Sequence, residues 1–385
     1  MVAQVAFSTV LLLGAALFGR TLEKLHTVDM GFDRNNVYLF TTNPPLSGYD
    51  ARRSAEFYQN FLDRVRQIRG IESSSLAHVA VMGGGGSRST VSVEGYQFKP
   101  GEDRNLNDNA ITPGYLQTLR IPLLLGRDFR EGDRLGSPRV AIINEACARY
   151  FFGTANPIGK RIGFGRDAKP NMEIVGVVKD GKYRNVREDT WRTLYVPFAQ
   201  TLDRPVGQMT LHVRADGDAS VATTGIRSVL HELDPNLPMF SAESLADRIE
   251  RNLGVERLIT LLSSSFGLLS LLLAALGLYG IVACSVSERT RELGIRIALG
   301  ARPSNVVGMI MRQTGLLLAA GTVIGVAAAL GLGRFVRSLL YGVVPNDATA
   351  IAATVLVLGI TALLASYVPA RRSTLIDPSV TLRYD

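Results

Sequence analysis

Residues 287–303 read SERTRELGIRIALGARP. The segment is charged at its start, ends in Gly-Ala-Arg-Pro, and carries apolar residues at helical spacing. Long apolar runs flank it, residues 258–286 before it and residues 306–333 after it. About 20 apolar residues are enough for a helix to cross a bilayer. We therefore interpret the segment as a short helix at a membrane surface, between two spanning helices.

Two more apolar runs complete the predicted membrane part, at residues 1–19 and 348–370. A cleaved signal peptide is the alternative for the first run. No basic residue precedes that run, and Arg20 and Glu23 stand where a small-residue cleavage site is expected, which favours a retained span. The predicted fold class is thus a membrane α-helical protein of four transmembrane helices. Residues 20–257 form a domain inserted between the first and second, and residues 258–385 form a permease-like unit.

The charge distribution predicts the orientation. The formal net charge is +8, and part of the excess is arginine at membrane edges, as positive-inside topology requires. Four arginines lie in residues 287–303 and three in the C-terminal tail, at positions 289, 291, 296, 302, 371, 372 and 383. These regions should face the cytoplasm, so residues 20–257 should lie outside. Zinc-finger spacing and aromatic–basic RNA motifs are absent from the sequence, which argues against a nucleic-acid partner.

The inserted domain reads as α+β. Residues 54–68 predict an amphipathic helix with Ser54 as a plausible N-cap. Further helices are predicted at about 145–152 and 219–233. Strand patterns occur at residues 36–42, 71–81, 90–94, 140–143, 173–178 and 209–213. Mixed strands and helices of this kind are typical of an α+β domain.

Three stretches of this domain superficially resemble catalytic motifs but do not match them. Residues 153–161, GTANPIGKR, have five residues between the glycines where a phosphate loop has four, and Arg161 where it has Ser or Thr. The glycine run at residues 83–86 lacks a nucleophile elbow and is predicted to be a flexible linker between strands. A set of carboxylates reads as solvated surface, and comprises Glu102, Asp103, Asp128, Glu131 and Asp133.

No catalytic, cofactor or metal site is predicted. The two cysteines, Cys147 and Cys284, are expected on opposite sides of the membrane, and the four histidines lack metal-ligand spacing. The spans lack a set of buried charges, which argues against a proton- or ion-coupled transporter. Gly321 and Gly325 form a G-x-x-x-G pair that either marks close helix packing or arises by chance in a glycine-rich span.

The sequence of about residues 287–300 predicts a helix and not a passive loop. Glu288 and Arg291 are spaced i,i+3, and Glu292 and Arg296 i,i+4, with the acid first in both pairs, which favours a helix. Gly300 is placed to end it. An amphipathic helix with a defined end predicts a docking element for a partner or for the bilayer surface.

The same segment carries a resemblance. SERTRELGIRIALGARP looks like the signature of the MacB/FtsX-like permeases of ATP-binding cassette (ABC) transporters. The tail YVPARRSTLIDPSVTLRYD, residues 367–385, is similar to that family's ending. VAIINEACARYFFGTANPIGKRI, residues 140–162, resembles its periplasmic core domain.

The resemblance implies a cytoplasmic coupling helix that docks on an ABC ATPase in a separate chain or domain, so that this chain is no enzyme and needs no cofactor of its own. The implied ATPase contacts are Glu288, Arg291, Glu292, Gly294, Arg296 and Gly300. It also implies a second permease unit, a lipid environment in the bacterial inner membrane, and transport by mechanotransmission. A signalling role that controls an outer-face enzyme is the alternative. Because little precedes the first span, the chain is expected to resemble the C-terminal half of a duplicated permease.

Overall fold

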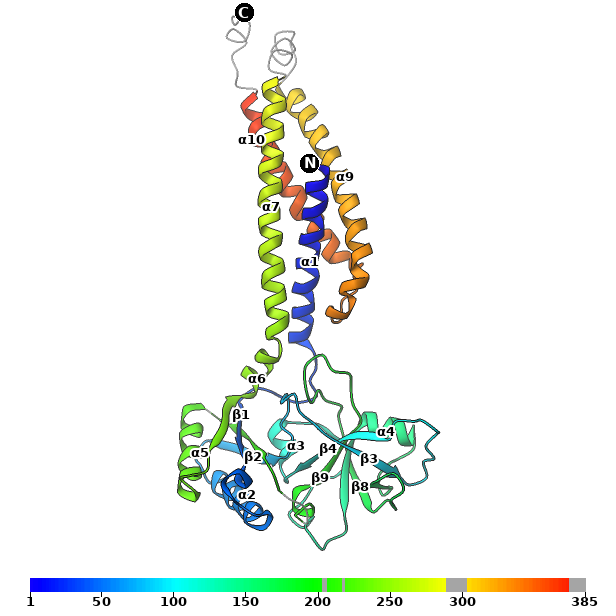
Figure 1. Cartoon of the computed structure of the whole chain (residues 1–385), viewed down its shortest axis with the longest axis vertical. Coiled ribbons are helices and arrows are strands. Elements are labelled where there is room, and N and C mark those ends of the chain that lie inside the picture. Colours follow the sequence, from blue (N-terminus) through cyan, green and yellow to red (C-terminus); the bar gives the residue numbers. More distant parts are fainter. Residues whose placement is uncertain (203–205, 217–218, 289–302, 374–385) are drawn as a thin grey trace, which may run out of the picture. The chain divides into compact units, whose positions relative to one another are not determined.

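The computed structural model describes residues 1–202, 206–216, 219–288 and 303–373, and the chain divides into two compact units. One unit contains the long apolar helices. The other, Val28–Asn252, is called the inserted domain here because it lies between the first and second of those helices in the sequence. Figure 1 shows both units.

Four helices of the described chain are long and apolar enough to cross a membrane. They are α1 (Val2–Thr27), α7 (Gly254–Glu288), α9 (Pro303–Val336) and α10 (Ala348–Ser373). Helix α1 contacts the other three, whereas α7 and α9 contact each other far less than either contacts α1 (Figure 1). Helix α1 therefore lies between α7 and α9, the two helices that flank residues 289–302.

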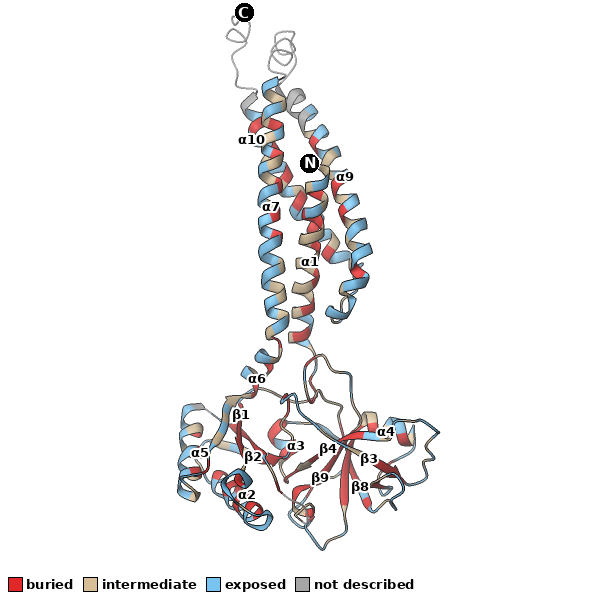
Figure 2. Cartoon of the chain, in the orientation of Figure 1, coloured by how far each residue is buried: buried red, intermediate tan, exposed pale blue. Residues whose placement is uncertain are grey.

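The outward faces of these helices are apolar and exposed, as Figure 2 shows for α7 along much of its length. Large exposed side chains on α7 include Leu261, Phe266, Leu272 and Leu276. Such faces are stable against lipid and unfavourable in water. The predicted class of membrane α-helical protein is confirmed by the four helices.

Helix α1 is longer than the predicted span of residues 1–19, because it continues to Thr27. Arg20, Glu23 and Lys24 end the apolar run, but glutamate and lysine are good helix formers, so the charges do not end the helix itself. The compact units likewise divide after Thr27 and Asn252 instead of after residues 19 and 257.

The inserted domain has two halves. The first, called the sheet subdomain, is the antiparallel order β11-β1-β10-β2 with α2 and α5 packed on its core. Its elements are β1 (Val37–Thr42), η1 (Pro44–Ser47), α2 (Ala51–Val65), β2 (Ile71–Ala77), α3 (Tyr115–Leu119), β10 (Met209–Ala215), α5 (Ala219–Leu233), β11 (Met239–Ser244) and α6 (Leu245–Asn252). Phe40, Tyr58, Phe61 and Leu211 are fully buried between sheet and helices.

The second half, called the barrel subdomain, follows the order β4-β3-β7-β8-β6-β9, and β9 pairs back onto β4, so that the pairing closes on itself. Its elements are β3 (Ser87–Val93), β4 (Asn105–Ile111), β5 (Leu123–Gly126), β6 (Val140–Asn144), α4 (Glu145–Phe152), β7 (Arg161–Phe164), β8 (Met172–Val178), β9 (Thr193–Pro197) and η2 (Phe198–Gln200). Its own core contains Val91, Ile143, Ile162 and Leu194. Closure leaves few unpaired edges.

Several local predictions are confirmed, and one is wrong. The predicted helices at 145–152 and 219–233 are α4 and α5. Ser54 is not an N-cap: α2 begins at Ala51, and the Asp50 carboxylate accepts from the backbone N–H of Arg53 at 2.7 Å. Aspartate caps a helix as well as serine does, and Ser54 lies inside the first turn.

Candidate functional site

The predicted docking residues lie almost wholly outside the described part of the chain. Arg291, Glu292, Gly294, Arg296 and Gly300 belong to residues 289–302. Glu288 is described: it is the last residue of α7, and it is exposed. The docking role of these six residues therefore stays a prediction, and the described residues on either side of the segment form the basis of the site.

Helix α1 is fixed to α7 by polar contacts inside the apolar bundle. The hydroxyls of Ser8 and Ser270 lie 2.6 Å apart and are buried. The Gln4 amide nitrogen donates to the Leu273 carbonyl at 2.7 Å, and the side chain of Gln4 lies against Gly277. Small and polar residues are the usual means by which membrane helices associate, because the bilayer provides no hydrophobic driving force between them.

The G-x-x-x-G pair marks the contact between α9 and α1. A Cβ atom at Gly321 would lie 2.6 Å from Cβ of Val5, and one at Gly325 would lie 2.6 Å from the Ala6 carbonyl oxygen. A heavier residue at either position would have to push the two helices apart. The structure therefore decides the question that the sequence left open: both glycines are packing residues.

The end of α1 nearer the inserted domain in sequence is also tied to the bundle. The Arg20 guanidinium on α1 pairs with the carboxylate of Asp347. Asp347 precedes α10, and it accepts from the Thr349 hydroxyl at 2.6 Å and from the Ala350 backbone N–H at 2.9 Å. These bonds, Thr349 first, lower the pKa of Asp347 to about 2. The carboxylate thus caps α10 and holds α1 against it.

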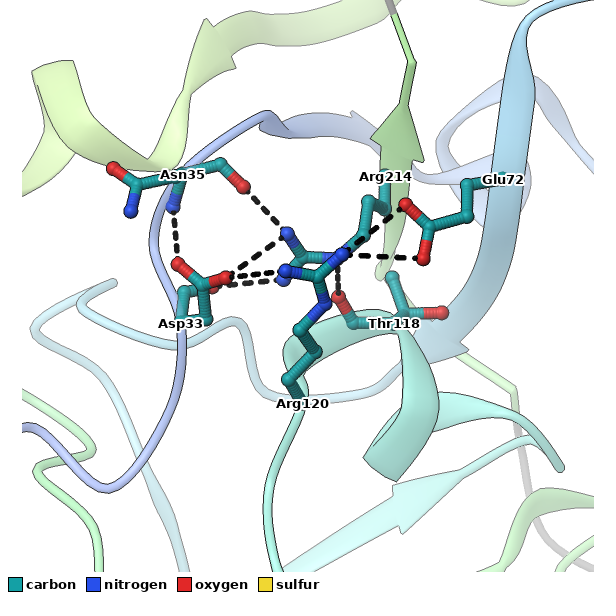
Figure 3. A network of polar contacts seen from close by, with 6 residues as sticks. All are labelled: Asp33, Asn35, Glu72, Thr118, Arg120 and Arg214. Carbon is teal, nitrogen blue, oxygen red and sulfur yellow. Dashed lines mark hydrogen bonds and ion pairs between the residues drawn. The ribbon is translucent and has the colours of Figure 1, made fainter.

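The chain leaves α1 through residues 28–36, called the N-terminal connection here. Figure 3 shows how Arg214 of β10 holds it. The Arg214 side chain is 1% exposed. It donates to the carbonyl of Asn35 at 2.7 Å, to the carbonyl of Asp33 at 3.1 Å and to that of Thr118 at 2.9 Å, and it pairs with the Asp33 carboxylate at 3.3 Å. One buried cation therefore binds three carbonyls and one carboxylate.

The Asp33 carboxylate also pairs with a second, more exposed arginine. Arg120 pairs with Asp33 at 3.0 Å and with Glu72 at 3.4 Å, and is about half exposed (Figure 3). Burial raises the pKa of Asp33, but the Asn35 N–H and the guanidinium groups of Arg214 and Arg120 outweigh it, so the pKa lies below the ordinary value. The carboxylate stays ionised, as a partner of a buried arginine must.

The N-terminal connection is also bonded to residues 179–191 of the barrel subdomain, called the 179–191 loop here. Asp29 pairs with Lys179 at 2.5 Å, and the Met30 carbonyl accepts from the Lys182 N–H at 2.9 Å. Gly31 has a φ of +77°, and a Cβ atom there would collide with the Asp180 carbonyl oxygen. Glycine is required at this position for both reasons. The connection is thus fixed to both subdomains.

The chain returns to the membrane helices through residues 239–252, called the C-terminal connection here. Arg248 and Arg251 of α6 both pair with Glu243. The Asn252 amide donates to the Met82 carbonyl at 3.0 Å, and Arg248 donates to the Val81 carbonyl at 3.4 Å. The C-terminal connection therefore rests on the β2–β3 loop, residues 78–86.

That loop contains the glycine run, and it is bonded in turn to the 179–191 loop. The Met82 N–H donates to the Tyr183 carbonyl at 2.7 Å, and the Gly84 N–H donates to that of Arg184 at 3.2 Å. A Cβ atom at Gly86 would lie 2.8 Å from the Arg184 guanidinium. The segment lies between strands as predicted, but the backbone of the β2–β3 loop is hydrogen-bonded on two sides, and the flexibility expected of the linker stays a prediction. The 179–191 loop is therefore bonded directly to the N-terminal connection and, through the β2–β3 loop, to the C-terminal connection.

Reasoning from the sequence missed this arrangement. Arg214 lies in a strand whose other residues are buried, which is the one local signal of an internally paired arginine. The bonds that join the 179–191 loop to Asp29, Met30, Met82 and Gly84 span about 100 residues or more of the sequence, and no local pattern encodes them. Such a network becomes visible only in the folded domain.

The carboxylates that the sequence assigned to solvated surface are engaged in contacts, and for Asp133 the prediction is wrong, because this side chain is buried. Glu102 accepts from Tyr96 at 2.7 Å and from Tyr150, and these bonds, Tyr150 first, lower its pKa to about 2. Asp103 pairs with Arg192 at 3.5 Å, and Asp133 pairs with Arg127 at 2.8 Å. Over the described ranges, no group of three or more His, Cys, Asp or Glu side chains is placed to hold a metal ion.

Comparison with known proteins assigns the family. Residues 2–226 match the MacB-like periplasmic core domain, and residues 264–378 match the FtsX-like permease C-terminal domain. An α+β domain inserted after the first of four membrane helices, followed by a helical unit, defines a permease of this architecture. The chain belongs to the MacB/FtsX-like permease family.

Named relatives share part of their length with the chain. It is 28% identical over 297 residues to the macrolide export ATP-binding/permease protein MacB of Burkholderia cenocepacia, covering 73% of this chain and 42% of that protein. It is 26% identical over 269 residues to the pyoverdine export ATP-binding/permease protein PvdT of Pseudomonas syringae, covering 68% and 40%. The chain thus spans about two fifths of the length of these relatives.

Among solved structures, the chain is similar to the periplasmic region of MacB from Actinobacillus actinomycetemcomitans, with a TM-score of 0.41 and 20% identity over 60% of this chain and 98% of that one. It is also similar to the extracellular domain of the noncanonic ABC-type transporter YknZ from Gram-positive bacteria, with a TM-score of 0.38 and 17% identity over 53% and 100%.

Proposed function

We propose that the chain is the transmembrane subunit of an ABC transporter of the bacterial inner membrane, and that it couples ATP hydrolysis by a partner ATPase to motion of the inserted domain. Four findings support this proposal: the family, the export functions of the relatives, the amphipathic sequence of residues 287–300, and the packing of α7 and α9, which flank that segment, on α1. In this proposal ATP is bound and hydrolysed by the partner and the chain binds no cofactor.

The observation that carries the proposal is the position of α1. It lies between α7 and α9 and is packed on them without space at Gly321, Gly325 and Gly267. If the ATPase moves residues 289–302, then α7 and α9 move, and close packing passes the displacement to α1. Helices α1 and α7 both continue directly into the inserted domain, so each displacement reaches it through a connection.

The inserted domain is then expected to move as a consequence. The N-terminal connection is bonded to the 179–191 loop directly and the C-terminal connection is bonded to it through the β2–β3 loop, so in this proposal the displacement of α1 and that of α7 meet at this loop. In this proposal a second permease unit completes the machine, lipid surrounds the helices, and the inserted domain lies on the outer side, where its rearrangement expels or releases a substrate.

Charge reversal of the coupling segment tests the proposal. We expect the Glu292→Arg/Arg296→Glu double variant to lose most of the ATPase that co-purifies with the tagged chain from membranes, because docking of a helix depends on its charged contacts. The matched control is Arg52→Glu/Glu56→Arg, an exposed i,i+4 pair on α2, which should retain the ATPase. Equal recovery from both variants would contradict the docking role.

A further inference from the structure

A polar groove lies between the β2–β3 loop and α6 in the inserted domain. Its volume is about 890 Å³. This is the size of sites that take drug-sized ligands. One wall is the glycine run, residues 83–86, and the opposite wall is α6 with Arg248, Arg251 and Asn252.

Hydroxyl groups from three adjacent strands form a row along the groove. Thr41 of β1 lies between Thr210 of β10, at 3.0 Å, and Ser241 of β11, at 2.9 Å, counted between hydroxyl oxygens. All three line the groove, as does the exposed side chain of Gln208. Hydroxyls and amides both donate and accept, so this surface suits a ligand that carries several hydroxyl groups.

A second, largely apolar cavity adjoins the groove. It measures about 190 Å³, and its apolar walls come from both subdomain cores, with Met209 and Phe198 from one and Met172 and Val196 from the other. Its polar lining includes Asp108, Arg139, Gln200 and Thr201. For comparison, an apolar cavity of about 150 Å³ is enough to hold benzene. His78 and Ser87 line both the groove and this cavity, so the two spaces share a wall.

Asp108 adds a polar feature to the apolar cavity. Its Oδ1 atom is buried and has no hydrogen-bond partner among the described residues. A buried acceptor without a donor is unfavourable, and a ligand hydroxyl would satisfy it. Asp108 lies directly opposite Ser87 in the β3–β4 pairing, so this oxygen belongs to the junction of the two spaces.

We propose that the groove and the cavity form one binding site for a small amphiphile, a ring-sized apolar group that carries a hydroxyl-rich part, as in an aromatic glycoside. The ring occupies the apolar cavity, the sugar lies along the hydroxyl row, and a hydroxyl at the junction donates to Asp108. This proposal rests on the proposed function in one respect, since it makes this class of molecule the one that is expelled or released.

One wall of the site, helix α6, leads in the sequence to the membrane helix α7. Asn252 is the last residue of α6, and α7 begins two residues later at Gly254. A displacement of α7 therefore moves the wall that carries Arg248, Arg251 and Asn252. In the proposed machine this changes the width of the groove, so that affinity for the amphiphile depends on the state of the ATPase.

Equilibrium dialysis of radiolabelled phenyl β-D-glucoside against the full chain in lipid nanodiscs, without any ATPase, tests the site. Empty nanodiscs correct for partition into lipid. We expect a Kd on the order of 0.1 mM, as is usual for a ligand of this size. Glucose alone and phenol alone should each bind at least tenfold more weakly. Equally tight binding of either fragment would overturn the single amphiphile site.

Two variants block the site at different points. Ala110→Phe fills the apolar cavity, and Ser87→Phe closes the junction from a partly exposed position where misfolding is not expected. Both should weaken binding at least tenfold, whereas Ala51→Phe, an exposed position on α2, should not. Emission of Trp191 reports folding of each variant. Unchanged affinity in a folded Ser87→Phe chain would overturn the proposal, whatever the outcome of the ATPase docking experiment.

Discussion

The two connections between the membrane helices and the inserted domain are built differently. The N-terminal connection is bonded through its own backbone carbonyls, to a guanidinium group that is 1% exposed and to the 179–191 loop. In the C-terminal connection, β11 pairs with β1 through its backbone, but α6, which precedes α7, is held to the β2–β3 loop by the ends of the Arg248 and Asn252 side chains, beside an open groove. Backbone bonds fix the path of a chain, whereas side-chain ends can change partners. We therefore expect the N-terminal connection to be the more rigid of the two and the α6 part of the C-terminal connection to be the more adjustable.

The largest effect should come from the buried cation of the N-terminal connection. Arg214→Leu removes four bonds: the carbonyls of Asp33, Asn35 and Thr118 lose the donor that Arg214 supplies, and the Asp33 carboxylate keeps only Arg120 and the Asn35 N–H. We expect the unfolding free energy to fall by about 3–5 kcal/mol. Urea unfolding of the nanodisc-embedded chain, followed by the emission of its single tryptophan, Trp191, measures this.

The outer arginine of the same network is the control. Arg120 is 55% exposed, so Arg120→Leu should cost about 1 kcal/mol or less, despite its two carboxylate partners. Equal losses from the two variants would mean that burial of Arg214 does not fix the N-terminal connection.

The second effect concerns the helix to which that connection is attached. Gly325→Leu on α9 would place atoms within 2.6 Å of the Ala6 carbonyl of α1, so the helices must separate. Overpacking of this kind costs about 1–3 kcal/mol. Gly315→Leu, on the same helix with nothing within 4 Å, is the matched control. The temperature at which each nanodisc-embedded variant aggregates gives the comparison, and a loss of stability in Gly315→Leu equal to that in Gly325→Leu would contradict close packing as the cause.

The helices were predictable from sequence, and the connections were not. An uncharged run of 29 residues has few stable solutions other than a membrane helix, so residues 258–286 were placed within a few positions of α7. Strand β4, NLNDNAI, is polar in sequence although two of its asparagines are buried: Asn107 accepts from Arg184, and Asn109 bonds with the backbone of Val79. Local hydrophobic alternation is the signal for strands, and β4 does not carry it.

The candidate site also has one part that the sequence predicts and another part that it does not. Ion-pair spacing and the terminal glycine of residues 287–300 are local features, so the docking hypothesis could be made from the sequence alone. The other part of the site comprises Arg214, Asp33 and the 179–191 loop. These residues are candidates because of their contacts, which join positions up to 181 residues apart in the sequence. Their importance depends on their burial in the folded domain, which the sequence alone does not show. The amphiphile site likewise depends on two cavities that share walls only in the folded domain.

A pH titration tests the burial of His212, a residue of β10 whose pKa is affected by the charge of Arg248 in the C-terminal connection. Burial, followed by the charge of Arg248, lowers the pKa of His212 from 6.5 to about 3. Below pH 6.5 the unfolded chain binds a proton that the folded chain does not, so the unfolding free energy falls as pH falls. The histidine should contribute a loss of up to about 2 kcal/mol between pH 6.5 and 5.

His212→Phe should remove that part of the slope, because phenylalanine does not titrate and fits the buried position beside the ring of Tyr115. Urea unfolding at several pH values above 5 measures it, before most carboxylates titrate. The exposed His231→Phe variant should keep the slope of the parent chain. A parent-like slope in His212→Phe would show that the histidine is not the group responsible.

The smallest effect is expected where the C-terminal connection is bonded to Met82 of the β2–β3 loop. Asn252→Ala removes the bonds to the Met82 and Arg248 carbonyls, at 3.0 and 2.9 Å, and should cost about 1 kcal/mol, because both acceptors lie beside a groove that water can enter. Hydrogen exchange should rise at residues 82–86 and stay unchanged at residues 28–36, since only the first segment loses a contact. Asn236→Ala, an exposed position, is the control and should change neither. A loss as large as that of Arg214→Leu, or faster exchange at residues 28–36, would contradict the distinction between a rigid and an adjustable connection.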